Sequence, residues 1–491
     1  MDSSPDGLRA AVLAGQGAGV DPWRDFLFAP SQQALAAWFG HPPIDIRAAI
    51  DSDIVALEAM ISEQVDAILH HPRFLALEGR WRAVFWLARL AAAEGWRRRV
   101  LFMLLPVTWA EIARDQERAA DFDQSQMFQK IYEETYGQAG GRPFGLIVVD
   151  HELQHLRSTE TGVDDVATVQ LLSQTGAAAF VPFIFAASPA LLGLMSFEQL
   201  ERVHALRPAF SDQAHQRWNT LMDRLDSRFI GITLPRVLIR PPWTDDAPHG
   251  LPFRYNEYAP DSADRVWVSA GFAFAAVVAR AFAQHSWPAD VRGADPDREG
   301  GGVVTRLPVE WFRSDLDGYW PRLPLEVQLT TEQERDLIEA GLMPVGALPY
   351  GSEPLFEVTR SLFRPGRYAG PNAAAAEANA MLSAQINSVL CASRFAHHLK
   401  IMARDMVGSV TTAEALERRL QDWLNQYVNP NLSAGAELLA KYPLAEGLVT
   451  VTDMPDRPGE YRTAIYLRPH YQLDDIRAVL ALDMTVKQEA A

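Results

Sequence analysis

The stretch FDQSQMFQKIYEETYGQAGGRPFGLIVV, residues 122–149, decides the fold of this chain. Its first half predicts a helix that Asp123 caps, that Gln126 closes by reaching back, and that Gly137 ends. The apolar positions of this helix fall on one face: Met127, Phe128, Ile131 and Tyr132. The second half runs through a glycine pair into an apolar strand. It contains no catalytic constellation, so the stretch is interpreted first as architecture.

Residues 145–186 indicate a strand, a helix and a second strand, with the sequences GLIVVD, DDVATVQLLSQTGAAA and FVPFIFAAS in that order. Nearly continuous apolar strands joined by a helix are typical of a buried parallel pair. Such a crossover is right-handed in almost every case. A central α/β domain is therefore expected.

More strands are predicted at 228–234 and 236–240, separated by Pro235. Residues 289–372 are rich in glycine and proline and predict loops and small strands that decorate the core. The expected fold class is α/β: a central domain with a mixed sheet and helices over residues 76–375, and a C-terminal α+β module of two helices and a β-hairpin over residues 376–491.

The N-terminal part divides into two pieces. Residues 1–44 show no sustained periodicity and are expected to form a mobile arm. Residues 45–75 predict an amphipathic helix that stops at His71 and Pro72, with an acidic face opposite an apolar stripe. The stripe consists of Ile50, Ile54, Leu57, Ile61, Val65 and Ile68. We expect this stripe to pack on the core of its own domain or on a neighbour.

The C-terminal part predicts a long helix to about residue 406 and a second over 412–428, capped by Thr411 with Glu414. A hairpin with strands 447–453 and 460–469 follows. Alternate positions of its second strand form an apolar face: Tyr461, Thr463, Ile465 and Leu467. Because such a strand can offer an edge for pairing between chains, these four residues are candidate assembly residues.

Composition restricts the classes of function. The 491 residues carry a formal net charge of −17, which disfavours binding to nucleic acid or to anionic membranes and suits a basic protein partner or simple solubility. The single cysteine, Cys391, excludes an internal disulfide and a cysteine metal site. The longest apolar run, Val266 to Ala279, is shorter than the roughly 18 residues that span a bilayer. A soluble, cytoplasmic protein without membrane insertion or cofactor is expected.

One short motif points to chemistry. The residues HELQH, 151–155, match the HExxH pattern, in which His151 and His155 would hold zinc while Glu152 activates its water. That chemistry needs the motif on a helix, whereas here it follows directly on a predicted strand. The third ligand is also not obvious. The interpretation of the motif as a coincidence is favoured, and a zinc-dependent hydrolase remains the alternative.

A second polar group lies near the C-terminus, where Arg394, His397, His398 and Lys400 follow one another on a predicted helix. Adjacent histidines on a helix point in different directions, so they do not form a metal site by themselves. A polar helix surface or an interface is the simpler interpretation.

The stretch that opens this section resembles one protein family closely. Members of the large-subunit family of the type VI secretion contractile sheath carry LEGxWRGL, FDQSQLF, YEE and GGxPFG, which correspond here to LEGRWRAV, FDQSQMF, YEE and GGRPFG. The resemblance continues through DSRFIGITLPRVLIR (226–240), 267–283, 382–409 and YLRPHYQLDDI (466–476). It covers roughly residues 60 to 485.

The resemblance implies a fold like that of phage tail sheaths and a structural, non-enzymatic role. It implies pairing with the small sheath subunit, a helical polymer with other copies of this chain around an inner tube protein, and indirect contact with a recycling ATPase. Three features depart from the family pattern: Ala83 replaces a glycine, VDHELQH replaces GDYEF, and residues 1–44 differ from the usual linker region. A diverged, non-polymerising sheath paralogue with a regulatory or capping role is therefore a second interpretation.

Overall fold

The computed structural model describes residues 46–487, except 97–98, 139, 160, 246–252, 295–299, 315–317, 349–350, 352, 367, 370–372, 407–411, 432–433, 455–459 and 471–479. The predicted arm, residues 1–44, lies outside this range. The chain divides into two compact units. One comprises residues 1–78 and 241–266, and the other comprises residues 79–240 and 267–491.

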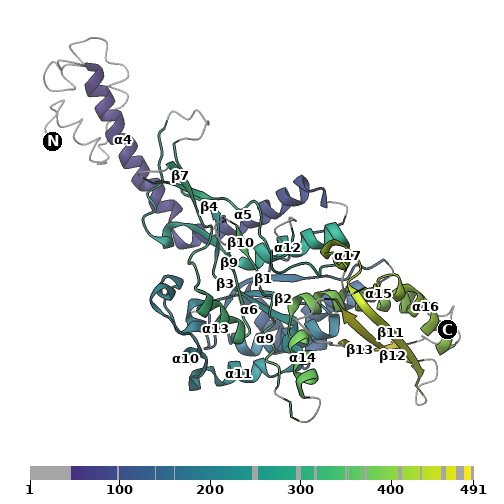
Figure 1. Cartoon of the computed structure of the whole chain (residues 1–491). Coiled ribbons are helices and arrows are strands. Elements are labelled where there is room, and N and C mark those ends of the chain that lie inside the picture. Colours follow the sequence, from purple (N-terminus) through teal and green to yellow (C-terminus); the bar gives the residue numbers. More distant parts are fainter. Residues whose placement is uncertain are drawn as a thin grey trace. The chain divides into compact units, whose positions relative to one another are not determined.

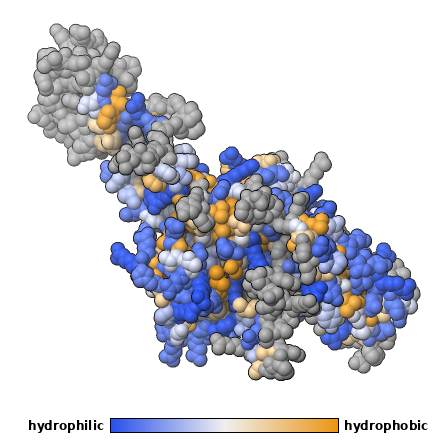
Figure 2. Space-filling model, viewed as in Figure 1, coloured by the Kyte–Doolittle hydropathy of each residue, from blue (hydrophilic) through white to orange (hydrophobic). Residues whose placement is uncertain are grey.

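The smaller unit is built on α4 (Ile46–Leu69), which matches the predicted amphipathic helix, and α5 (Pro72–Ala93) begins immediately after it. The polar side of α4 binds the segment 253–264: Tyr255 donates to Asp66 over 2.5 Å, and His70 lies 3.0 Å from Glu257. The apolar stripe is not packed within this unit, because Ile54, Ile61 and Ile68 are 47, 49 and 61 % exposed. Figure 2 shows orange apolar atoms beside blue polar atoms along this helix. Both expected packing partners, the core of its own domain and a neighbour, therefore stay predictions.

A parallel sheet forms the centre of the larger unit (Figure 1). Its strands follow the order β1 (Ile147–Leu153), β2 (Phe183–Ala187), β3 (Ile230–Leu234) and β8 (Met343–Pro344). All three pairings are parallel. The predicted strand, helix and strand order is confirmed, with α9 (Asp165–Ala179) as the crossover helix. The antiparallel pairs lie in small separate sheets, so the α/β class holds while the central strands themselves are not mixed.

Helices pack on both faces of this sheet. On one face α9 approaches closely at Gly176, where an added Cβ would lie 3.2 Å from the Phe183 side chain and 2.8 Å from the Val181 carbonyl oxygen. On the other face α12 (Ala270–His285) approaches at Gly271, where an added Cβ would lie 3.4 Å from Ile184. Successive strand residues point to opposite faces, so β2 is buried on both sides.

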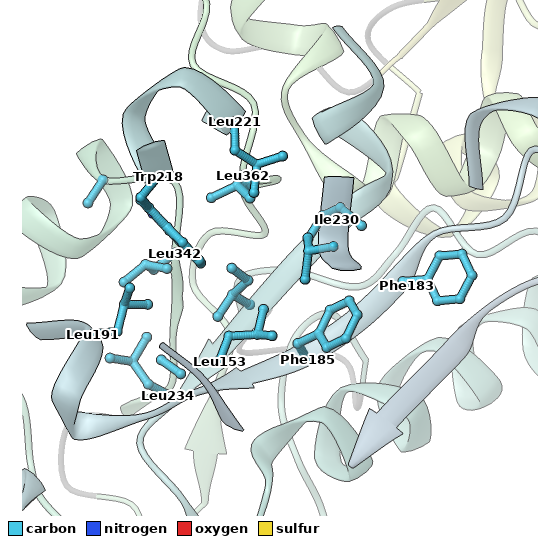
Figure 3. Packing of buried hydrophobic residues seen from close by; sticks show 14 of the residues in the cluster. Leu153, Phe183, Phe185, Leu191, Trp218, Leu221, Ile230, Leu234, Leu342 and Leu362 are labelled. Atoms are coloured by element: carbon cyan, nitrogen blue, oxygen red, sulfur yellow. The ribbon is translucent and has the colours of Figure 1, made fainter. Parts of the chain in front are cut away.

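The hydrophobic core lies on the α9 face of the sheet (Figure 3). Phe185 of β2 lies near Leu153 and Ile230, Phe183 lies farther along the same strand, and Trp218 lies near Leu342 in the same cluster. These side chains are at most 1 % exposed, and several come from segments that are far apart in the sequence. Their burial supplies the main stabilisation of the unit, since each large apolar side chain contributes roughly 1.5 to 3 kcal/mol.

The glycine- and proline-rich region contains the hairpin β6 (Glu310–Ser314) and β7 (Gly318–Arg322), and the short pair β9 (Gly346–Ala347) and β10 (Pro354–Leu355). It also contains α13 (Thr331–Glu339), which begins with a capping box of Thr330 and Gln333. Leu337 of α13, Leu342 and Leu362 belong to the central core, and β8 adds a strand to the sheet. Part of this region therefore builds the core rather than decorating it.

The predicted helix over 122–136 is present but interrupted. It consists of a 3-10 turn at Phe122–Gln124, α7 (Gln126–Phe128), a π-helical turn at Gln129–Glu133 and α8 (Glu134–Tyr136). Asp123 is not the cap. Ser125 accepts from the Phe128 N–H, and the Asp115 carboxylate accepts from the two preceding amides. A residue distant in sequence thus supplies the acceptor that the local pattern assigned to Asp123, while Gly137 does end the helix.

The larger unit also contains α6 (Trp109–Arg118), α10 (Arg207–Phe210), α11 (Gln216–Met222) and short 3-10 turns at Pro189–Leu192, Phe197–Arg202, Gln213–His215 and Leu225–Phe229. A further 3-10 turn, Ser262–Asp264, belongs to the smaller unit. Two further strands are β4 (Val237–Arg240) and β5 (Val266–Val268).

The C-terminal part has α14 (Ala373–Ser383), α15 (Ile386–Asp405), α16 (Ala413–Asn425) and α17 (Ala436–Lys441). The long helix predicted to residue 406 is therefore two helices. Thr412, rather than Thr411, caps α16 by accepting from the Ala415 N–H. Three antiparallel strands, β11 (Leu444–Asp453), β12 (Glu460–Pro469) and β13 (Leu480–Lys487), pair in that order. The third strand was not expected from the sequence.

Truncation of α13 at its core contact tests whether this region supports the central sheet. Leu337→Ala removes a side chain that is 0 % exposed, so we expect a loss of about 3 kcal/mol in the free energy of unfolding. Arg335→Ala on the exposed face of the same helix is the control and should change stability by less than about 0.5 kcal/mol. Denaturant titration of the purified chain measures both. Equal, small effects would contradict the assignment of α13 to the core.

Candidate functional site

The HELQH residues lie at the end of a strand, not on a helix. His151, Glu152 and Leu153 are the last three residues of β1, and the chain then turns toward α9. Successive side chains of a strand point to opposite faces, so His151 and Glu152 face different surroundings. The helical spacing that would bring both histidines to one metal ion is absent here.

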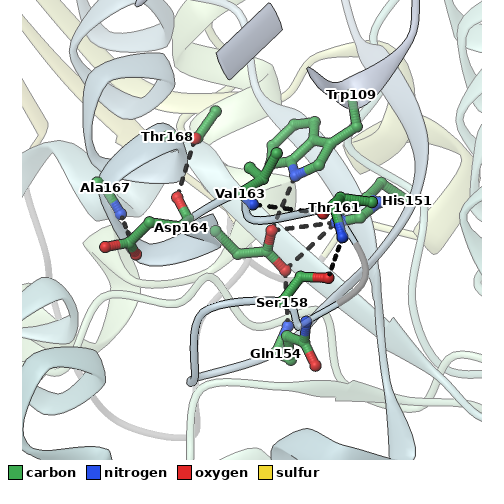
Figure 4. A network of polar contacts seen from close by, with 10 residues as sticks. Trp109, His151, Gln154, Ser158, Thr161, Val163, Asp164, Ala167 and Thr168 are labelled. Carbon is green, nitrogen blue, oxygen red and sulfur yellow. Dashed lines mark hydrogen bonds and ion pairs between the residues drawn. The ribbon is translucent and has the colours of Figure 1, made fainter. Parts of the chain in front are cut away.

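A buried carboxylate holds His151. Asp165, 1 % exposed at the start of α9, accepts from the Trp109 indole N–H over 2.8 Å and from the Gln154 N–H over 3.0 Å. Its two oxygens lie 3.2 Å from Nε2 of His151, whose ring stacks on Trp109 at 4.4 Å (Figure 4). A buried carboxylate with three donors is a structural joint. It ties α6, β1 and α9 together.

Glu152 pairs with a cation instead of facing His151. Its carboxylate accepts two hydrogen bonds from the Arg236 guanidinium, over 2.5 and 2.8 Å. Arg236 also donates to Glu326 over 3.2 Å. Burial raises the pKa of Glu326 to about 7, although the positive charge of Arg236 opposes this shift. Because Arg236 binds both oxygens of Glu152, the Glu152 carboxylate is not free to activate a water molecule.

His155 lies in a third environment. Its ring stacks on His215 at 3.7 Å, and His215 Nε2 lies 2.9 Å from the Leu191 carbonyl oxygen. Burial, and then the neighbouring His215, lower the pKa of His155 to about 4, so its ring is neutral near pH 7. A hollow of about 530 Å³ next to this pair is also lined by Ser211 and Asp212.

The three residues of the motif thus go to three different sets of partners. Among the residues that the structure describes, no group of three or more histidine, cysteine, aspartate or glutamate side chains is arranged to hold a metal ion. The geometry favours the interpretation of HELQH as a coincidence of sequence.

The basic residues of α15 are more buried than a polar surface would be. His397 is 1 % exposed, and burial together with Arg394 lowers its pKa to about 3. The Lys400 ammonium lies 4.1 Å from the ring centre of Tyr132 and 4.6 Å from that of Tyr136, and burial lowers its pKa to about 8. Arg404 donates to the Tyr136 carbonyl. These contacts attach α15 to the helix of residues 126–136.

The candidate assembly residues lie on an inner strand. β12 pairs with β11 on one side and with β13 on the other. Thr463, Ile465 and Leu467 are at most 1 % exposed and face the core beneath α15 and α16. In this fold β12 therefore offers no free edge, which differs from the expectation. A strand from another chain can pair only with β11 or with β13.

The outer edge of β11 is already occupied by α16. The Val449 N–H donates to Oε1 of Gln421, the Gly447 carbonyl accepts from the same side chain, and the Val451 N–H donates to Glu417. Leu444 exchanges main-chain hydrogen bonds with Tyr427 and Asn429. Covering an edge in this way is a known protection against pairing with other chains. Within the part of the chain that the structure describes, no main-chain hydrogen bond reaches the outer edge of β13, so this edge is the remaining candidate for strand addition.

The register identifies the open groups of β13. The main-chain N–H groups of Val449 and Val451 point away from β12, toward α16. The even-numbered residues of β12, such as Ala464, therefore form the main-chain hydrogen bonds with β11. The odd-numbered residues of β12 then form their main-chain hydrogen bonds with even-numbered residues of β13, such as Thr463 with Met484. The main-chain groups of the remaining β13 residues point outward, namely Ala481, Asp483, Thr485 and Lys487.

Comparisons with known proteins agree with this architecture. Residues 51–362 match the family model described as EvpB/VC_A0108, tail sheath N-terminal domain, and residues 375–486 match EvpB/VC_A0108, tail sheath gpW/gp25-like domain. The chain belongs to the EvpB/VC_A0108 tail sheath family. It is also 32 % identical over 438 residues to the type VI secretion system sheath protein TssC1 of Pseudomonas aeruginosa strain PAO1, covering 88 % of this chain and 85 % of that protein. The resemblance noted in the sequence is thereby confirmed.

Two further features follow from the structure. Within its described part, no helix is both long enough and apolar enough to span a bilayer. Sequence reasoning also passed over residues 101–107, LFMLLPV, although the structure leaves most of their side chains exposed. An apolar run between an arginine triplet and a proline is the pattern of a buried strand. Here these side chains are exposed among the residues that the structure describes.

Substitutions at the buried carboxylate separate a structural joint from a metal site. Asp165→Ala leaves the donors of Trp109 and Gln154 without a buried acceptor, so we expect a loss of about 3 kcal/mol in stability. His151→Phe keeps a ring stacked on Trp109 and should cost less than about 1 kcal/mol. Thermal unfolding of both variants, with zinc analysis of the wild type, gives the answer. Stoichiometric zinc that disappears in His151→Phe would contradict the joint.

Proposed function

We propose that this protein is a structural subunit of a type VI secretion contractile sheath, the large subunit of its heterodimer. Membership in the tail sheath family over both domains carries this proposal, together with the similarity to a type VI secretion sheath protein along 88 % of the chain. The polar clusters that could suggest an enzyme are engaged in structural contacts. The protein is therefore proposed to act by assembly and not by catalysis.

The proposed partners follow from this role. The chain pairs with the small sheath subunit, and the pairs stack with other copies into a helical polymer around the inner tube protein. Contraction of the polymer drives the tube and its effectors outward. A separate ATPase recycles the contracted sheath, chiefly through the small subunit, so this chain needs no nucleotide site of its own.

Assembly is proposed to use strand addition to the C-terminal sheet. β12 is inside that sheet and α16 covers β11, so the open edge is β13. Main-chain hydrogen bonds across an edge join two chains without fixing the relative orientation of their domains. A lattice tied together in this way can change its packing while its subunits stay connected.

Electron microscopy of the coexpressed chains tests the function. The full chain, expressed with the small subunit from the same locus, should form hollow tubules in negative stain. A soluble heterodimer without tubules would favour the regulatory paralogue. The absence of any complex would contradict the sheath function, and stoichiometric zinc in the purified chain would then favour the hydrolase.

A pair of proline variants tests the open edge. Asp483→Pro removes an outward N–H that the sheet does not use, so the chain should fold and bind the small subunit while tubules are lost. Met484→Pro removes an N–H that pairs with Thr463, so it should unfold the C-terminal sheet itself. Thermal unfolding and negative-stain microscopy are the measurements. Normal tubules from Asp483→Pro would remove β13 as the assembly edge.

A further inference from the structure

Residues 101–107, here named the open segment, form an apolar surface outside both sheets discussed so far. Leu101, Met103 and Leu104 are 69, 65 and 63 % exposed, and Leu105 is 53 % exposed. With roughly 200 Å² for each large apolar side chain, the segment leaves on the order of 600 Å² of apolar surface in water. A patch of this size is typical of an interaction site.

The main chain of the open segment is also without partners. None of its N–H or carbonyl groups forms a hydrogen bond with any other residue that the structure describes. The segment contains no helix, turn or bend, so it runs in the manner of a single strand. Free main-chain groups beside exposed apolar side chains are the features of a strand that joins a sheet supplied by another molecule.

Both ends of the open segment are fixed, so its exposure is built into the fold. Before it, Arg99 donates to the Ala283 carbonyl and the Val100 N–H donates to the Trp96 carbonyl. After it, Thr108 forms a capping box with Glu111, and the Trp109 indole binds the buried Asp165. A strand held at both ends loses little conformational entropy when a partner binds.

We propose that the open segment is the docking strand for the sheath small subunit, which adds a β-strand to it and covers both of its faces. This inference rests on the proposed function. Alternate residues of a strand face opposite sides, and here Met103 and Leu104 are exposed alike. A strand that is apolar on both sides belongs inside a sheet buried on both faces. The partner is therefore a folded subunit and not a lone peptide arm.

The apolar character favours the small subunit over a second copy of this chain. In a contractile lattice, contacts between successive heterodimers must slide, whereas the two chains of one heterodimer stay together. Permanent interfaces are the more apolar class, and they are usually larger than the roughly 800 Å² from each partner of a standard interface. The open segment exposes apolar side chains on both of its sides, so it fits the apolar part of a permanent contact.

Charge gives the chemistry of the partner strand. Arg97, Arg98 and Arg99 come before the open segment in the sequence, separated from it by Val100, in a chain whose formal net charge is −17. We expect the strand of the small subunit to carry apolar residues on both faces and an acidic residue at the end that lies beside Arg99.

A double substitution on the open segment tests the docking strand. Met103→Glu combined with Leu105→Glu places two charges where the partner would bury apolar side chains, so affinity for the small subunit should fall roughly 100-fold. Met195→Glu is the matched control, because Met195 is an apolar side chain 89 % exposed elsewhere. Full-length chains coexpressed with a tagged small subunit are compared by quantitative co-purification. Unchanged binding of the double variant would overturn the docking strand.

Further readouts separate this inference from the function on which it rests. A wild-type chain that forms no complex would overturn the sheath function itself. If the double variant still binds the small subunit but loses self-association in light scattering, the occupant is a second copy and the inference is wrong. Hydrogen exchange of the wild-type chain covers the case of a misfolded variant: amides 101–105 should become protected in the complex, and a lack of protection would contradict the proposal.

Discussion

The requirement that every main-chain hydrogen-bonding group in a buried strand finds a partner governs this structure. The inner strands β2 and β3 meet it within the chain, because each has a parallel neighbour on both sides and residues that are all buried. In the C-terminal sheet the same requirement is met on β11 by side chains of α16. Two sets of strand-like groups have no such partner in the described chain, those on the outer edge of β13 and those of the open segment. The surfaces that we propose for assembly are those where main-chain groups have no hydrogen-bond partner among the described residues.

The polar clusters of the protein serve the same architecture. Asp165 joins α6, β1 and α9 through three donors, and Arg236 connects Glu152 to Glu326. Each cluster replaces hydration that burial removes, and each would leave unpaired groups if one member were lost. Lys400 likewise connects α15 to the helix of residues 126–136, because its ammonium group lies over the rings of Tyr132 and Tyr136. Residue types that catalyse reactions in other proteins here fix the relative positions of helices and strands.

The sequence predicted the elements whose pattern is local. The parallel pair, its crossover helix and the amphipathic helix after residue 45 follow from periodicity, which depends only on neighbouring residues. The features that the sequence assigned wrongly, a helix cap and a strand edge, depend on residues that are distant in the sequence. Asp115 supplies the acceptor expected of Asp123, and β13 occupies the edge expected to be free on β12. The motif HELQH gives the same lesson, since its meaning depends on a helix that the parallel sheet does not allow. The family resemblance was readable because it rests on several motifs in one order.

A contractile polymer needs two kinds of contact, and we propose a different surface of this chain for each. Contacts that persist through contraction gain from apolar area, because their separation would expose that area to water. Contacts that allow domains to move gain from main-chain pairing at a single edge, which tethers two chains through a narrow strip. The open segment has the first character, with apolar side chains on both of its sides. The β13 edge has the second, since the remaining edge of that sheet is closed by Glu417 and Gln421.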